Sequence, residues 1–64
     1  MDTHWWWTEG YAQGTADGKY DMKACRDAYE LLCKFNGVRK SIVTYRAFLR
    51  GVREAIKPHM GKQT

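Results

Sequence analysis

The chain has 64 residues, a formal net charge of +4, two cysteines and two histidines. A domain this short buries only about 60% of the surface that its unfolded chain exposes, so an enclosed catalytic cavity would be hard to build. No apolar run reaches the length of a membrane span and no signal-peptide pattern is present, which predicts a cytoplasmic protein with no membrane partner. The composition favours a small binding protein over an enzyme.

The charge is divided unevenly between the two halves of the chain. Residues 1–30 carry six acidic and three basic side chains, whereas residues 31–64 carry one acidic and eight basic side chains. Such asymmetry indicates a partner rich in phosphate or carboxylate groups for the second half. A solvated basic helix face would give the same pattern.

Hydrophobic periodicity predicts an all-α fold, a single three-helix domain that spans residues 1–64. The helices are expected over approximately residues 3–17, 22–35 and 41–57. N-terminal caps are available at Asp2 or Thr3, at Asp21 and at Ser41. Gly18 and the Asn36-Gly37 pair suit helix C-termini. Pro58 is expected to end the third helix, because proline disfavours helical backbone at the residue before it, which leaves 59–64 as a loose tail.

The first predicted helix combines glycines with a tryptophan triplet. Gly10 and Gly14 each cost up to about 1 kcal/mol in a helix, so they indicate close approach of another helix or an aromatic ring. Consecutive helical residues point about 100° apart, so Trp5, Trp6 and Trp7 cannot all face one small core. At least one indole should lie on the surface or against a partner; a wide aromatic cap over the core is the alternative.

The second predicted helix has one apolar stripe and both cysteines. The stripe consists of Met22, Cys25, Tyr29 and Leu32, widened by Ala28, Leu31 and Phe35. Cys25 and Cys33 are eight residues apart, which is about 12 Å along a helix and too far for a disulfide. We expect two free, buried thiols. The spacing of cysteines and histidines matches no zinc site, and no cofactor or metal is expected.

The third predicted helix has an apolar stripe and a basic stripe. The apolar one consists of Ile42, Tyr45, Leu49, Val52 and Ile56, with Leu49 expected at the centre of the core. The basic one consists of Arg46, Arg50, Arg53 and Lys57. We expect this basic stripe to contact nucleic acid or another partner. Arg39, Lys40, Trp5 and Trp6 complete the predicted binding residues.

Two short segments resemble the ribosome modulation factor family of bacteria and their phages, in which a Gly-Tyr-x-x-Gly helix precedes a helix with Gly-Trp-Arg-Glu-Ala. The matching residues are Gly10-Tyr11-Ala12-Gln13-Gly14 and Gly51-Val52-Arg53-Glu54-Ala55, with Tyr45 or Phe48 as the preceding aromatic. Val52 replaces the tryptophan, the family's Cys-Pro linker is absent, and an additional helix separates the motifs. The resemblance implies a small basic protein that binds ribosomal RNA. It does not extend to ribosome dimerisation, because of the inserted helix.

A second resemblance, to a helix-turn-helix, spans residues 32–38 and Val43. Cys33 takes the small position, Gly37 the turn and Val43 the branched position, while Asn36 and Arg46 stand where apolar residues are usual. A helical hairpin with an Asn-Gly cap would produce most of this pattern.

The sequence contains no catalytic constellation and no phosphate-binding glycine loop. We therefore expect a non-enzymatic binding protein whose first candidate partner is ribosomal RNA or the ribosome. The alternatives are a phage-type inhibitor that binds an acidic surface of a host protein complex, including anti-defence roles, and a helix-turn-helix DNA-binding protein. A homodimer is left open.

Overall fold

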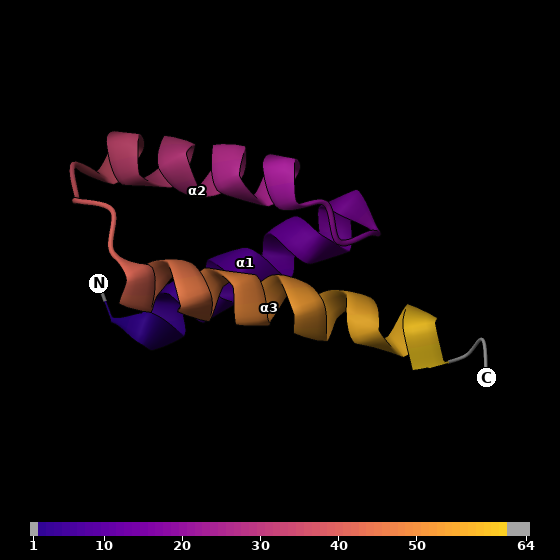
Figure 1. Ribbon diagram of the computed structural model, residues 1–64. Coiled ribbons are helices and arrows are strands. Elements are labelled where there is room, and N and C mark those ends of the chain that lie inside the picture. Colours follow the sequence, from indigo (N-terminus) through magenta and orange to yellow (C-terminus); the bar gives the residue numbers. More distant parts are fainter. Residues whose placement is uncertain (1, 62–64) are drawn as a thin grey trace.

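The computed structural model describes the backbone of residues 2–61 and the side chains of residues 2–57. Its elements are α1 (Thr3–Asp17), α2 (Met22–Asn36) and α3 (Ile42–Gly61), with no strand in the described part of the chain (Figure 1). The predicted all-α, three-helix domain is confirmed. No helix in this part is both long and apolar enough to cross a membrane.

Side chains and glycines at the helix ends explain why the first two helices begin and end where they do. The Asp2 carboxylate accepts a bond of 2.9 Å from the Trp5 N–H. Asp21 caps α2 in the same way through the N–H groups of its first turn. Gly18 and Gly37 follow the two helices with φ angles of 72° and 64°, the left-handed conformation that glycine adopts without steric cost. These four predicted caps are confirmed.

The third helix begins as predicted and extends beyond its predicted end. Ser41 Oγ accepts a bond of 3.2 Å from the Val43 N–H, as expected of an N-cap. The helix then continues through Pro58 to Gly61, so the predicted end at residue 57 and the loose tail at 59–61 are wrong. Proline removes one hydrogen bond from a helix and only biases the residue before it, so helical backbone can continue past it. Residues 62–64 lie outside the described part.

The helices α1 and α3 cross with their backbones in contact. A Cβ atom added at Gly10 would overlap the Phe48 carbonyl oxygen, and one at Gly51 would overlap the Trp7 carbonyl oxygen. A Cβ at Gly14 would lie 2.6 Å from the Val52 carbonyl oxygen. The close approach predicted from Gly10 and Gly14 is confirmed.

The order of these contacts gives the relative direction of the two helices. Gly10 meets Phe48, and Gly14, one turn later, meets Val52, one turn later on α3. The helices α1 and α3 therefore run parallel and lie against each other, and α2, which connects them in the sequence, runs back in the opposite direction on one side of the pair (Figure 1).

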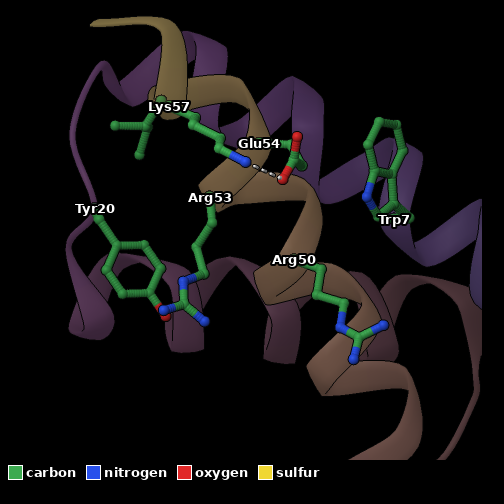
Figure 2. A pocket seen from close by; sticks show the side chains of 7 residues that line it. Trp7, Tyr20, Arg50, Arg53, Glu54 and Lys57 are labelled. Carbon is green, nitrogen blue, oxygen red and sulfur yellow. Dashed lines mark ion pairs between the residues drawn. The ribbon is translucent and has the colours of Figure 1, made fainter. Parts of the chain in front are cut away.

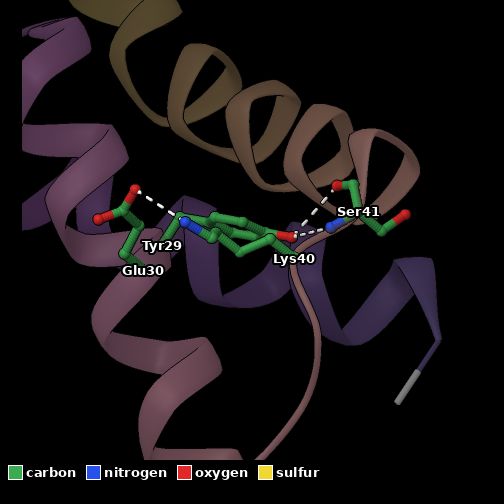
Figure 3. A network of polar contacts seen from close by, with 4 residues as sticks. All are labelled: Tyr29, Glu30, Lys40 and Ser41. Atoms are coloured by element: carbon green, nitrogen blue, oxygen red, sulfur yellow. Dashed lines mark hydrogen bonds and ion pairs between the residues drawn. The ribbon is translucent and has the colours of Figure 1, made fainter.

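Helix α2 packs on this pair through large side chains rather than through its backbone. The Tyr29 ring lies 5.0 Å from the Trp6 ring and 5.9 Å from the Phe48 ring, measured between centroids. Its hydroxyl accepts a bond of 2.9 Å from the Ser41 N–H (Figure 3). The same hydroxyl lies 2.6 Å from Thr44 Oγ1. Tyr29 thus ties α2 to both other helices.

The predicted apolar stripe of α3 is confirmed at Val52 and Ile56, which are buried, but the centre of the core lies at Phe48, one residue before the predicted Leu49. Phe48 and Val52 are fully buried, whereas Leu49, predicted at the centre, is half-buried at the edge of the core. Ile42, the first residue of the predicted apolar stripe, is 66% exposed. Which side of α3 is buried depends on both helices that pack against it. The side that faces α1 consists of small residues, so a search for regularly spaced large apolar residues does not find it.

The apolar stripe of α2 is narrower than predicted. Cys25, Tyr29 and Cys33 are buried, while the predicted members Met22, Leu31 and Phe35 are exposed. One helix of this size offers the α1–α3 pair only a narrow face, so the remaining apolar side chains stay outside the core.

The two cysteines are free and buried, as predicted from their spacing. Burial raises the pKa of the Cys25 thiol above its ordinary value, and the negative charge of Asp17 raises it further. A thiol held in its protonated form is a poor nucleophile, so Cys25 acts here as a small core residue.

Candidate nucleic-acid interface

The basic stripe of α3, Arg46, Arg50, Arg53 and Lys57, is exposed along its whole length. Each member follows the previous one by three or four residues, so all four lie on the face opposite Phe48 and Val52. Within the described side chains, Arg46 and Arg50 take part in no ion pair, and Lys57 pairs with Glu54 at 3.7 Å. The side chains of Arg46 and Arg50 are therefore free to contact an anionic partner.

A row of stacked rings on α1 borders this stripe. His4, Trp7 and Tyr11 form what we call the aromatic row. The Trp7 ring lies 5.3 Å from the Tyr11 ring at an interplanar angle of 28°, and 6.4 Å from the His4 ring at 6°. The spacing of three and four residues puts these side chains on one face of α1. Rings that face the solvent in this way can accept a further planar group by stacking.

Two surface hollows join the aromatic row to the basic stripe. Both are lined by Trp7 and Arg50. The first continues past Arg50 to the remaining residues Tyr20, Arg53, Glu54, Ile56 and Lys57. The second continues toward the helix N-termini and is completed by Thr3, His4, Val43, Arg46 and Ala47. The half-buried indole of Trp7 is therefore the point at which the two hollows meet.

Tyr20, from the connection between α1 and α2, lies at the far side of the first hollow. The Arg53 guanidinium carbon lies 5.7 Å from the centroid of the Tyr20 ring, a cation–π distance. Figure 2 shows Trp7 on one side of α3 and the Tyr20–Arg53 pair on the other. This contact holds Arg53 in place while leaving its N–H groups available at the surface.

The structure corrects the predicted role of one tryptophan. Trp6 is 1% exposed and packs edge-on against Trp5, with ring centroids 4.9 Å apart, so it is a core residue and not a binding residue. Trp5 is half-buried beside it. Trp7, which was not among the predicted site residues, is the indole that borders the basic stripe. Its spacing from His4 and Tyr11 is readable in the sequence and was the available signal.

The predicted site residues Arg39 and Lys40 lie apart from the basic stripe. Both are exposed in the connection between α2 and α3, and neither lines the two hollows around Trp7. Lys40 forms an ion pair of 3.4 Å with Glu30 of α2 (Figure 3). The structure therefore brings together Arg46, Arg50, Arg53 and Lys57, and leaves the other two basic residues elsewhere.

The structure also bears on the two sequence resemblances, to a helix-turn-helix and to ribosome modulation factors. Val43, at the branched position of the helix-turn-helix resemblance, is 59% exposed instead of packing α2 against α3, which argues against that motif. Gly10, Gly14 and Gly51, from the two segments that resemble ribosome modulation factors, meet at the α1–α3 crossing. Close packing is thus one reason for glycine at these positions.

Comparison of the chain with protein-family models, with curated proteins and with solved structures finds no match. Among the described residues, no group of three His, Cys, Asp or Glu side chains is placed to hold a metal ion.

Proposed function

We propose that this protein is a non-enzymatic, cytoplasmic RNA-binding protein that contacts ribosomal RNA through the basic stripe of α3. The observation that carries the proposal is the position of this stripe beside the aromatic row. Phosphate groups and bases are the two chemical features that every RNA strand offers, and the surface provides a complement to each.

The basic stripe suits a phosphate backbone. From Arg46 to Lys57 the helix rises about 16 Å, so the stripe is long enough to contact several consecutive phosphates of a strand. Arginine is always charged and its planar guanidinium binds phosphate through two parallel hydrogen bonds. Three arginines in a row thus give affinity without sequence preference.

The aromatic row favours single-stranded RNA over a duplex. Unpaired bases can stack on aromatic side chains, and each such contact contributes about 1–3 kcal/mol. In a duplex the bases are already stacked on one another, and the deep groove of A-form RNA excludes side chains. The surface is therefore suited to the loops and single-stranded ends of ribosomal RNA, where unpaired bases are exposed.

A second candidate function, a phage-type inhibitor that binds an acidic surface of a host protein complex, is favoured by Trp7. This indole is half-buried and adjoins Arg50, and tryptophan and arginine are the residues that most often dominate protein interfaces. Such an interface would resist salt more than phosphate contacts do.

The test compares two variants with the same net charge. Reversing Arg46, Arg50 and Arg53 to glutamate removes the basic stripe, and reversing the exposed Lys19, Lys23 and Arg26 to glutamate is the matched control. Binding of the parent and both variants to a fluorescent single-stranded RNA, to its duplex and to bacterial ribosomes would be measured over a range of salt concentrations.

We expect the stripe variant to keep its helical CD signal and to lose RNA binding far more than the control. Each lost phosphate contact should lower the slope of log K against log salt by about 0.7. Equal RNA binding by the two variants would show that the basic stripe is only a solvated helix face and does not contact RNA. If the parent shows no affinity for RNA but captures a protein in a complex that resists nuclease and high salt, the inhibitor function is favoured instead.

A further inference from the structure

Helix α2 has a second apolar row that the core does not use. Ala24, Ala28, Leu31 and Phe35 follow one another at alternating intervals of four and three residues, the spacing of the a and d positions of a heptad. Leu31 is 54% exposed and Phe35 is 79% exposed. The two alanines are half-buried, so this row lies along the edge of α2, next to the face that packs on α1 and α3.

Such exposure of large side chains in a regular helical row indicates an unoccupied helix-packing surface. Phe35 alone would be an ordinary exposed residue, but it is one turn from Leu31 on the same face. We propose that this row binds a second copy of the same chain, with the two α2 helices packed antiparallel.

The sizes of the side chains fit an antiparallel arrangement. In an antiparallel pair each a position lies opposite a d position of the other helix. Phe35 of one copy then lies over Ala24 of the second, and Leu31 lies over Ala28, so every contact joins a large side chain to a small one. Alternation of large and small residues across facing positions lets two helices pack without voids or clashes.

Charge complementarity favours the same arrangement. Asp27 and Lys34 are one heptad apart, so they lie on the same edge of the row, and both are exposed. Within the described side chains neither forms an ion pair. An antiparallel pair places residues of the same edge opposite each other, so Asp27 would face the second copy's Lys34, twice by symmetry. In a parallel pair residues of the same edge do not face each other, so Asp27 and Lys34 would not pair across the interface.

The row on α2 and the basic stripe on α3 share no residue. The inference therefore does not depend on the proposed RNA binding, and either can fail alone.

Sedimentation equilibrium of the parent and of charge-swapped variants tests the proposal. Asp27→Lys alone and Lys34→Asp alone should each weaken dimerisation about tenfold or more, because like charges would then face each other. The double variant Asp27→Lys/Lys34→Asp should dimerise as the parent does. Arg26→Glu, an exposed charge reversal on the side of α2 opposite the row, is the matched control and should leave the dimer unchanged.

A second variant, Leu31→Ser/Phe35→Ser, should be monomeric and keep the helical CD signal, because neither side chain is in the core. A parent that stays monomeric at millimolar concentration overturns the proposal. So does a double charge swap that fails to restore the dimer, since the pairing of Asp27 with Lys34 would then be wrong.

Discussion

The crossing of α1 with α3 and the packing of α2 on that pair use opposite means. At the crossing, glycines on both helices let the backbones touch. Helix α2, in contrast, is held at a greater distance by the rings of Tyr29, Trp6 and Phe48. The first contact has almost no freedom to adjust, whereas rings and hydroxyls can shift by changes of rotamer.

This difference predicts where the fold tolerates change. A backbone contact responds to a single added carbon, because neither helix can move without losing the other contacts along the crossing. A contact between side chains loses only what the altered side chain contributed. Three substitutions test this contrast, and their expected effects decrease in the order given.

Gly10→Ala should destabilise the fold most. The new Cβ would overlap the Phe48 carbonyl oxygen, and separating the helices would disturb the contacts of Gly14 and Gly51 as well. We expect a loss of about 3 kcal/mol or more in the free energy of unfolding, despite the better helix propensity of alanine. Urea unfolding monitored by CD measures the change.

The control is Thr8→Ala, which introduces the same side chain at an exposed position of α1. It should change stability by no more than about 0.5 kcal/mol. Equal stability of the two variants would mean that the helices cross at a greater distance than the structure shows.

Tyr29→Phe should have an intermediate effect. The ring contacts with Trp6 and Phe48 remain, but the Ser41 N–H loses the hydroxyl that accepts its bond of 2.9 Å. A partly buried donor left without a partner costs about 1–3 kcal/mol. The matched control is Tyr45→Phe, since the Tyr45 hydroxyl makes no hydrogen bond within the described residues, and this variant should unfold at nearly the parent's urea concentration.

The smallest expected effect is that of Cys25→Ala on the pH dependence of stability, through the ionisation of this thiol on the α2 side of the core. Its pKa in the folded protein is raised above the ordinary value of 9.0, mainly by burial and then by Asp17. Above pH 9.0 the unfolded chain therefore loses this proton while the folded chain keeps it, and stability falls as the pH rises. Below that pH the thiol contributes no pH dependence. The Cys25→Ala variant should show a shallower loss of stability between neutral and alkaline pH than the parent. Identical slopes would contradict a buried, protonated thiol.

The ends of α1 and α2 were predictable from local chemistry. A carboxylate that accepts a backbone N–H bond and a glycine that adopts a positive φ act within a few residues, so Asp2, Asp21, Gly18 and Gly37 mark their helices without help from the rest of the chain. The same holds for the free thiols, because the rise along a helix keeps Cys25 and Cys33 apart. Pro58 was misread because proline only biases its neighbour, and the helix continues through it.

Which residues face the core was decided by the tertiary structure. Periodicity identifies an apolar side of a helix, but its centre depends on where the neighbouring helices lie. On α3 the α1 side is buried through Gly51 and Ala55, whose small size hides them from a search for large apolar residues, so the core is centred on Phe48 and Val52 rather than Leu49. On α1 the same crossing buries Trp6 and leaves Trp7 beside the arginines of α3, because adjacent indoles point about 100° apart and only one can enter the core.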